Sequence, residues 1–455
     1  MQIAQELAGY SLGEADLLRR AMGKKIAAEM AKQRPRFVDG ALERGVDKAK
    51  AQQIFDLLAK FADYGFNKSH AAAYALVAYQ TAWLKANHPV AFLAASMTVD
   101  VGNTAKLNDF RREAARIGVT VLPPSINASA ADFTIDGENR IHYALTAIRN
   151  VGRQAVEHIV EARGDRAFAS LADFARRISP RFVNKRALES LAAAGAFDCI
   201  EVNRARVFAC AEAIMAISAR SEEGRVGGQN DLFGEAREDD LPHAGLVDWL
   251  PAERLSREYE AIGSFLTGHP LDAYGPVLTR QAVMSVREFE AGAQAGTAAA
   301  RIAGIVVAKQ IRRTRNGGRL AVIGLSDPSG QVECVAFSEA LGAWAHLTEI
   351  GTPVIANVVV DRGGDMPRYR IQDLKSLEDV AARLSHTLHI HVADAGALDS
   401  IRTRLTAKGD GEVSLFLRLD GEQEVQMRLG SRYAVTPQLA AAIKAIPGVD
   451  EAVYQ

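Results

Sequence analysis

The chain has 455 residues, of which 48% are hydrophobic and 24% are charged, and its formal net charge is −1 at pH 7. This length and composition predict three or four folded domains with cores of their own, and they exclude a collagen-like, low-complexity or wholly disordered protein. The balanced total hides local asymmetry, because residues 1–120 carry 17 Lys and Arg but 12 Asp and Glu, whereas residues 221–240 are acidic. Charge separated in this way predicts several surfaces with different partners.

Cysteine content and hydropathy exclude further classes of protein. The three cysteines, Cys199, Cys210 and Cys334, are too widely spaced for a disulfide framework or a zinc pattern. No apolar run reaches membrane-spanning length, and the first five residues do not read as a signal peptide. We therefore expect a cytoplasmic protein with no membrane partner, whose sequence starts inside a helical region rather than at the beginning of a domain.

Residues 1–120 are predicted to be almost entirely helical. Ser11 and Glu14 form a capping box at the start of one helix, and further helices are expected at residues 26–44 and 47–60. The first of these helices ends in four cations around Gly23, which are Arg19, Arg20, Lys24 and Lys25. Arginine binds phosphate oxygens through two parallel hydrogen bonds and lysine adds a mobile charge, so phosphate binding is one interpretation. A basic helix end in water is the other.

The next helix is predicted to be buried. Apolar residues cover almost every face of residues 71–84, Ser69 is a natural N-cap, and Pro89 should end the helix after residue 88. The polar residues at its start are Asn67, Lys68, Ser69 and His70. Free N–H groups and the positive end of the helix dipole make this cluster suitable for phosphate. The alternative is a capped core helix whose polar end meets water.

The next segment is a short connector with a predicted hairpin at residues 133–143. It is followed by a glycine turn between two helical segments. Residues 147–160 give a helix, a turn at Gly152 and a second helix whose apolar positions include Val156 and Ile159. This helix-hairpin-helix pattern needs glycine because the backbone N–H groups of the turn must approach a DNA phosphate closely. The candidate duplex contacts are Arg149, Asn150, Val151, Gly152 and Arg153. A plain helical turn is the alternative.

Residues 219–241 are rich in glycine and acidic residues and are predicted to be flexible. Within them lies the run Gln229, Asn230, Asp231, Leu232 and Phe233. An isolated Leu-Phe pair in such a segment has no core to join, so we expect it to fill an apolar cleft on a partner, with Gln229 bonding at the rim. Residues 246–271 then give a helix and a packed corner to which we assign no chemistry.

Strands dominate from residue 297. Five strands are predicted, at residues 299–308, 319–326, 331–337, 353–361 and 368–374, with a helix at 338–347, and this order matches the five-stranded OB-fold barrel. The expected loop at residues 309–319 carries five cations and no acid, namely Lys309, Arg312, Arg313, Arg315 and Arg319. We expect a modest electrostatic site for single-stranded DNA there, with Phe337 as the main stacking residue. A solvated hairpin tip is the alternative.

The remaining residues, 386–455, mix strands with helices near residues 398–408 and 437–446. His389 and His391 alternate along a strand, but without further ligands they read as surface histidines. The sequence contains no Asp-x-Asp pair of the kind that holds the two metal ions of nucleotidyl transfer. We therefore predict neither a catalytic residue nor a metal site in this chain.

Several of these segments together resemble one family. Residues 64–70 (YGFNKSH), 73–76 (AYAL), 79–85 (YQTAWLK) and 17–25 (LLRRAMGKK) look very like the fingers region of the bacterial replicative DNA polymerase III alpha subunit, a family C polymerase. Residues 183–198 resemble the second half of its tandem helix-hairpin-helix unit. Residues 229–233 resemble its sliding-clamp-binding peptide, and the terminal domain corresponds to the one that contacts the clamp-loader subunit tau.

The resemblance implies a multidomain α+β architecture. Its order is a helical fingers region (1–120), a connector (121–145), a tandem helix-hairpin-helix domain (146–218), a flexible linker with the clamp peptide (219–245), a helical connector (246–296), an OB-fold (297–380) and a small α+β terminal domain (381–455). It implies binding of deoxynucleoside triphosphates and template-primer DNA, and tethering to the clamp. In the family the catalytic aspartates, and with them Mg²⁺, belong to the upstream palm, so we expect a fragment that does not polymerise alone. The alternative function is a non-catalytic adaptor that binds DNA and the clamp.

Overall fold

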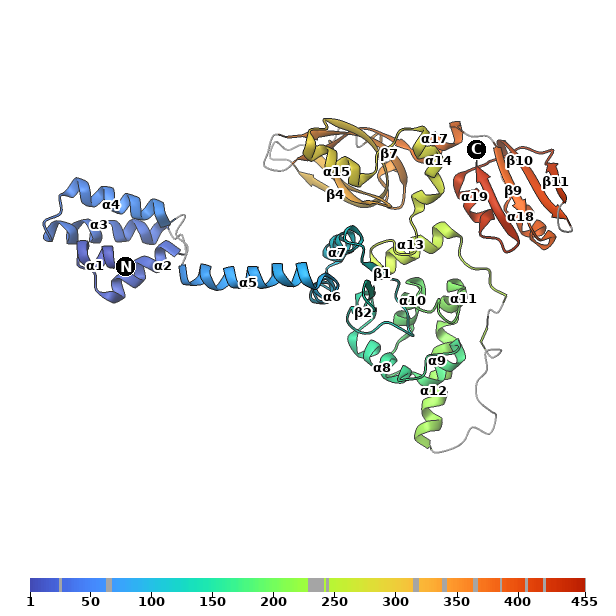
Figure 1. The fold of residues 1–455 in the computed structure, drawn as a ribbon, viewed down its shortest axis with the longest axis horizontal. Coiled ribbons are helices and arrows are strands. Elements are labelled where there is room, and N and C mark those ends of the chain that lie inside the picture. Colours follow the sequence, from blue (N-terminus) through green and yellow to red (C-terminus); the bar gives the residue numbers. More distant parts are fainter. Residues whose placement is uncertain are drawn as a thin grey trace. The chain divides into compact units, whose positions relative to one another are not determined.

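The computed structural model describes residues 1–23, 27–62, 68–227, 241–242, 245–313, 319–337, 342–362, 367–384, 387–405, 408–419 and 423–454. The chain divides into two compact units, Met1–Phe92 and Leu93–Gln455 (Figure 1). No helix among the described residues is long and apolar enough to cross a membrane.

The first unit is helical, as predicted. Its helices are α1 (Gln2–Ala8), α2 (Leu12–Gly23), α3 (Ala27–Glu43), α4 (Lys48–Ala62) and α5 (Lys68–Asn87). The apolar faces of the first four helices meet around Phe37, whose ring lies 6.2 Å from that of Tyr10 and 5.5 Å from that of Phe55. The predicted capping box is present, because Ser11 N donates to Glu14 and Glu14 N donates to Ser11 Oγ.

Helix α5 corrects one prediction. It ends at Asn87, before Pro89 begins α6 (Pro89–Val99), as the proline required. Burial on all sides was wrong, since Tyr74 is 61% exposed, Tyr79 67% and Trp83 47%. A helix that is apolar all round is buried only where polypeptide surrounds it on several sides. The residue pattern shows that the surface of the helix is apolar, but it does not show whether other polypeptide covers that surface.

The second unit begins within α6 and continues with α7 (Thr104–Arg116) and a small sheet. Its strands are β1 (Thr120–Leu122), β2 (Thr134–Asp136) and β3 (Arg140–His142), in the order β1-β3-β2. Strands β2 and β3 form the predicted hairpin, with Ile135 opposite Ile141. Ile141 is fully buried, so the hairpin is anchored by its inward face.

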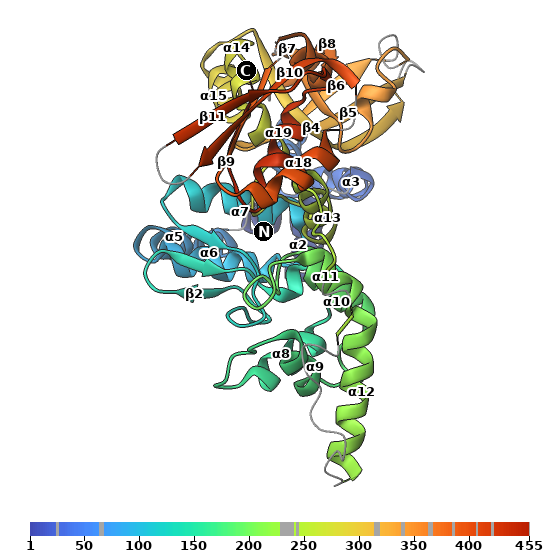
Figure 2. The same cartoon turned by 90° about the vertical axis from the view of Figure 1, so that its right-hand side faces the viewer.

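The helical region that follows packs around phenylalanines. Its elements are η1 (Leu145–Ala147), α8 (Arg153–Arg163), α9 (Leu171–Arg177), α10 (Lys185–Ala193), α11 (Arg204–Ala209) and α12 (Ala211–Gly227). The ring of Phe174 lies 5.0 Å from those of Phe168 and Phe197. Helix α12 runs beside α9 (Figures 1 and 2). It continues to Gly227, so the start of the segment predicted to be flexible is helical.

The predicted OB-fold is confirmed as a closed barrel in the order β4-β5-β6-β8-β7. Its strands are β4 (Ala299–Arg313), β5 (Arg319–Asp327), β6 (Gly330–Phe337), β7 (Pro353–Asp361) and β8 (Arg368–Ser376). The helix predicted at residues 338–347 is seen only as the 3-10 turn η4 (His346–Thr348), and residues 338–341 lie outside the described part. The barrel follows α13 (Pro251–Ile262), η3 (Pro270–Tyr274), α14 (Gly275–Arg280) and α15 (Val286–Ala295).

The terminal domain is α+β, as predicted. It contains α17 (Leu377–Leu384), β9 (Thr387–Val392), η5 (Ala395–Ala397), α18 (Leu398–Arg404), β10 (Lys408–Leu419), β11 (Gln423–Arg428), α19 (Pro437–Lys444) and β12 (Val449–Tyr454). The sheet order is β11-β10-β9-β12, and β12 was not predicted. Its core is continuous with Tyr274 and with Ile305 of β4, so the domain packs directly on the barrel and the preceding corner.

Candidate nucleic-acid interface

The turn at Gly152 is open on its outer side. Asn150 takes the left-handed conformation (φ 64°), whereas Gly152 has ordinary extended angles (φ −79°, ψ 152°). A Cβ atom built on Gly152 would meet no other atom within 4 Å. The fold itself therefore does not require glycine at this position, and the free space is available to a group from outside the chain.

Gly152 is also the N-cap of α8, an 11-residue helix whose cap makes no side-chain hydrogen bond. The first N–H groups of a helix have no partner within the helix, and they carry the positive end of its dipole. An anion that approaches over Gly152 would meet these groups without obstruction. The first arm of the motif is shorter than predicted, because only the 3-10 turn Leu145–Ala147 precedes the turn.

The two arginines beside the turn differ in their partners. Arg149 Nη1 donates to the carbonyl of Glu260 at 2.9 Å, so its charge is not neutralised by that contact. Arg153 pairs with Asp132 at 2.5 Å, and this hydrogen bond raises the pKa of the guanidinium. Val151 is buried and Asn150 Nδ2 donates to Ser190 Oγ at 3.2 Å. Of the predicted contacts, Arg149 and the backbone at Gly152 are the most available to an incoming phosphate.

A second turn, after α10, is held by a buried ionic network that the sequence did not reveal. Arg204 is 1% exposed, and it pairs with Asp198 at 2.7 Å and with the fully buried Glu258 at 2.9 Å. Burial opposes the charge of Arg204, but the hydrogen bonds to both carboxylates outweigh it and raise the guanidinium pKa. The one signal in the sequence was the helical spacing of Arg204 with Val207 and Ala211, which places a cation on the same face as two apolar residues.

Glu258 also fixes the corner that follows α13. Its Oε1 accepts from the backbone N–H groups of Leu266 (2.5 Å) and Thr267 (2.9 Å), and its Oε2 accepts from Thr267 Oγ1 at 2.6 Å. His269 in this corner is buried, and desolvation lowers its pKa to about 4. The Arg204–Glu258 pair thus ties the helical region to the segment that leads into the barrel.

The candidate phosphate contacts of the first unit are only partly described. Arg19 and Arg20 both pair with Asp16, at 2.8 and 2.9 Å, and the hydrogen bond from Arg19 is the largest cause of the lowered pKa of that carboxyl. His70 is exposed, with its ring 4.5 Å from that of Tyr74. The side chains of Lys24, Lys25, Asn67, Lys68 and Ser69 lie outside the described residues. The same holds for the clamp-peptide candidates Gln229, Asp231, Leu232 and Phe233.

On the barrel, the cations predicted to lie in a loop extend a strand instead. Strand β4 runs to Arg313, which pairs with Arg319 at the start of β5. Lys309 Nζ donates to Thr348 Oγ1 at 2.7 Å, and Arg312 is exposed and donates to Gln310. The pattern was misread because a run of cations suits either a loop or an exposed strand end. Arg315 and the side chain of Arg319 lie outside the described residues.

Strand register places an aromatic residue beside these cations. Arg312 pairs with Leu320, and Leu320 pairs with Phe337, so the three side chains share one face of the barrel. Phe337 is 48% exposed. In the adjacent row Val335 pairs with Arg370 of β8, a cation that sequence reasoning missed because parallel register cannot be read from local pattern. The face combines a stacking surface with charge.

Within the described residues, no group of three or more His, Cys, Asp or Glu side chains is placed to hold a metal ion. His389 and His391 lie on β9 against Phe416 of β10, at ring distances of 5.3 and 4.6 Å. His391 Nδ1 lies 3.2 Å from Glu424. These contacts give both histidines partners within the terminal sheet.

Three family profiles match the chain. They are the finger domain of the bacterial DNA polymerase III alpha subunit (residues 1–45), a helix-hairpin-helix motif (118–207) and an OB-fold nucleic acid binding domain (300–377). Curated proteins called DNA polymerase III subunit alpha are similar over most of the chain. The one from Caulobacter vibrioides is 43% identical over 99% of this chain and 40% of its own length, and that from Vibrio cholerae is 38% identical over 99% and 40%.

The Thermus aquaticus relative is 42% identical over 84% of this chain and 31% of its own length. The chain thus spans about two fifths of the length of the first two of these relatives. The matched profiles follow the same order as the helical unit, the Gly152 region and the barrel of the structure. The chain belongs to the bacterial DNA polymerase III alpha subunit family, and it corresponds to the finger, helix-hairpin-helix and OB-fold region of that subunit.

Proposed function

We propose that this chain holds template-primer DNA during replication, as the C-terminal part of a DNA polymerase III alpha subunit. The observation that carries this proposal is the open turn at Gly152, where a helix start without a side-chain cap lies beside free space and the exposed Arg149 comes shortly before it in the chain. A duplex phosphate bound there would accept from backbone N–H groups, and Arg149 would supply charge. The contact is independent of base sequence, as a replicative enzyme requires.

Single-stranded template is proposed to bind the barrel face that contains Arg312, Phe337 and Arg370. Stacking of a base on an exposed ring and neutralisation of backbone phosphates are the two recurrent ingredients of sequence-tolerant single-strand binding. Arg313, Arg315, Arg319 and Lys309 complete the proposed cationic set. With one exposed aromatic ring on this face, we expect modest affinity and a strong dependence on salt.

A substitution at Gly152 tests the duplex site. Gly152→Asp should weaken binding of the full chain to a primed duplex by about tenfold, because a carboxylate would occupy the place of the phosphate. Gly430→Asp is the matched control, since Gly430 also has open space around its Cβ position. Fluorescence anisotropy at several salt concentrations measures both. Equal affinities of the two variants, or no salt dependence in the wild type, would refute the proposed contact.

Clamp tethering is proposed through Gln229, Asp231, Leu232 and Phe233. A tethered polymerase rebinds its template at high effective concentration, which would explain processivity. The double variant Leu232→Ala, Phe233→Ala should lose capture by an immobilised sliding clamp while its duplex affinity is unchanged. Unaltered capture would place the clamp contact elsewhere in the chain.

In the intact subunit, Arg19, Arg20, Lys24, Lys25 and Lys68 are proposed to neutralise the triphosphate of an incoming nucleotide or template phosphates, together with Asn67, Ser69 and His70. Mg²⁺ would be held by the remainder of the polymerase. The terminal domain is proposed to contact the clamp-loader tau subunit.

The second candidate, a non-catalytic adaptor, uses the same modules. Primer extension with Mg²⁺ and nucleotides separates the two functions when the palm-containing part of a relative is added. Synthesis that depends on this chain supports the polymerase function, whereas no gain over the palm-containing part alone supports the adaptor. Extension by this chain alone would contradict the expected absence of the palm.

A further inference from the structure

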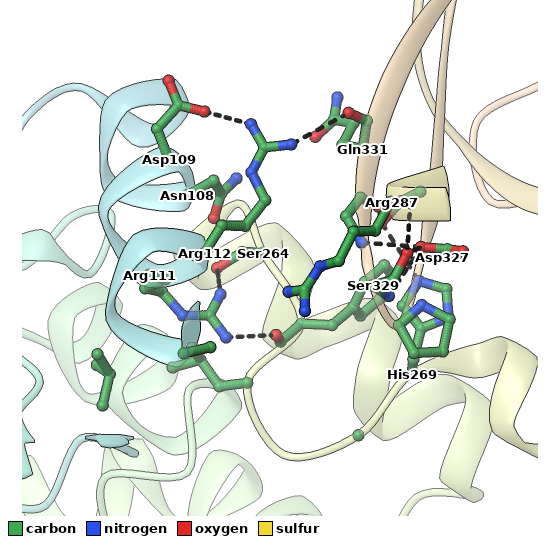
Figure 3. A pocket seen from close by; sticks show the side chains of 18 of the residues that line it. Asn108, Asp109, Arg111, Arg112, Ser264, His269, Arg287, Asp327, Ser329 and Gln331 are labelled. Carbon is green, nitrogen blue, oxygen red and sulfur yellow. Dashed lines mark hydrogen bonds and ion pairs between the residues drawn. The ribbon is translucent and has the colours of Figure 1, made fainter. Parts of the chain in front are cut away.

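A cavity of about 790 Å³ lies within the second unit, between helix α7, the corner at residues 264–272 and the β5–β6 turn of the barrel (Figure 3). The proposed duplex and single-strand contacts lie outside its lining. Its size is within the range of pockets that hold small molecules. Three arginines reach it from two sides, Arg111 and Arg112 from α7 and Arg287 from α15.

Two of these arginines have no carboxylate partner among the described residues. Arg111 donates to Ser264 Oγ at 2.9 Å and to the carbonyl of Phe265 at 3.0 Å, and both acceptors are neutral. The Arg287 side chain extends from the barrel side toward the α7 side of the cavity in Figure 3, and no ion pair of its guanidinium is recorded within the described part. Arg112 differs, because it pairs with Asp109 and reaches the carbonyl of Gln331 at 3.4 Å.

The acidic residues of the lining are largely committed to other donors. Asp327 accepts from Val286 N (2.8 Å), from the backbone and hydroxyl of Ser329 (2.8 and 2.7 Å) and from Gly330 N (2.8 Å). Asp272 accepts from His269 N at 2.7 Å. Asp109 pairs with Arg112, and the exposed Glu333 is the remaining acid. Two unneutralised guanidinium groups therefore share the cavity with carboxylates that mostly have donors of their own.

Burial makes this arrangement costly for Arg111. Desolvation lowers the pKa of its guanidinium, and the negative charge of Glu258 opposes the effect without forming an ion pair with Arg111. Glu258 is already bound by Arg204. An anion between Arg111 and Arg287 would supply the missing partner, and the planar forks of the two guanidinium groups suit phosphate oxygens.

We propose that this cavity is a phosphate-binding site, in which Arg111 and Arg287 hold a phosphate group of a nucleotide or of a nucleic-acid backbone. Ser264 and Asn108 provide neutral polar groups beside it. Because Arg111 belongs to α7 and Arg287 to the helix that precedes the barrel, the bound phosphate bridges the two modules. The site is separate from the Gly152 turn and does not depend on it.

Titration of the full chain with inorganic pyrophosphate by calorimetry tests the proposal. Arg287→Gln should weaken pyrophosphate binding by about tenfold, because a charge-assisted pair of hydrogen bonds is lost. Arg287→Lys should recover part of the affinity, since it keeps the charge without the fork. Arg383→Gln, which removes an exposed arginine of α17 outside the cavity, should bind as the wild type does. All three variants should keep duplex binding at the Gly152 turn.

Competition identifies the source of the phosphate. Displacement of pyrophosphate by a 12-nucleotide oligothymidylate assigns the site to a nucleic-acid backbone, and displacement by a deoxynucleoside triphosphate alone assigns it to a nucleotide. No saturable binding of pyrophosphate up to millimolar concentration, or equal losses in Arg287→Gln and Arg383→Gln, would overturn the proposal. Pyrophosphate binding that neither competitor displaces would also overturn it, because it would show a site for small inorganic anions only.

Discussion

The two glycine turns of the helix-hairpin-helix region use the same residue for opposite reasons. Gly152 has extended angles and open space where its Cβ would be, so the absence of a side chain leaves room for a group from outside the chain. Gly195 has φ +81°, and a Cβ there would lie 2.2 Å from Arg204 Nη2. One turn is open for a ligand and the other closes over a buried ion pair. A glycine in a motif is therefore evidence for a binding site only where the fold itself could accept another residue at that position.

Removal of the buried cation should have the largest effect on the closed turn. Arg204→Met should cost about 3–5 kcal/mol of unfolding free energy, because Glu258 and Asp198 lose their partner in a buried environment. Urea unfolding followed by Trp249 fluorescence, in a chain with Trp83 and Trp344 replaced by Phe, reports on this region.

Arg254→Met is the control, since Arg254 contacts Asp198 and Asp248 but is 29% exposed at its side chain. It should cost less than half as much. A cost for Arg204→Met below about 1 kcal/mol would show that the network does not hold the turn.

Substitution of Gly195, the glycine of the closed turn, should have the second-largest effect on the free energy of unfolding. Gly195→Ala should destabilise the same transition by about 3 kcal/mol, since it combines a left-handed backbone with a contact that displaces Arg204. Combined with Arg204→Met, the alanine should cost much less than it does alone, because the atom it displaces is gone. Additive costs in the double variant would contradict this explanation.

Acid should destabilise the corner at residues 264–272, which the Arg204–Glu258 pair supports. His269 is neutral in the fold, with a pKa lowered by burial to about 4, whereas the unfolded histidine titrates near 6.5. The unfolded chain therefore takes up a proton first, and stability is lost as pH falls from about 6.5 toward 4. Between pH 7 and pH 5 this amounts to about 2 kcal/mol.

His269→Asn keeps an acceptor for Leu271 N and should remove this part of the acid sensitivity. Parallel pH profiles for the wild type and His269→Asn would show that the histidine is not the titrating group.

The smallest effect on stability is expected at the open turn. Gly152→Ala should change the unfolding free energy by no more than about 0.5 kcal/mol, because its backbone angles are accessible to alanine and no atom is in the way. It should nevertheless weaken duplex binding. A large loss of stability would remove the distinction between the two turns.

The sequence predicted element types well where local pattern determines them. The order of the five predicted strands identified the barrel, and Pro89 correctly ended α5. Prediction from the sequence failed where a contact or the burial of a surface depends on residues far away in the chain. Arg204 and Glu258 are 54 positions apart, the exposure of α5 depends on surfaces that no local pattern specifies, and Arg370 joins its face through strand register alone. The Gly152 turn was located because a glycine between two helical segments is a pattern that the local sequence shows.

The exposed aromatic residues of α5 have a practical consequence for handling the chain. A helix that presents Tyr74, Tyr79 and Trp83 to water should attract hydrophobic dyes and chaperones and should promote self-association at high concentration. Trp83 gives a direct optical reporter of this surface, since its emission should shift to the blue when any polypeptide covers the helix. Solubility, rather than folding, is then the property that an added covering partner would improve first.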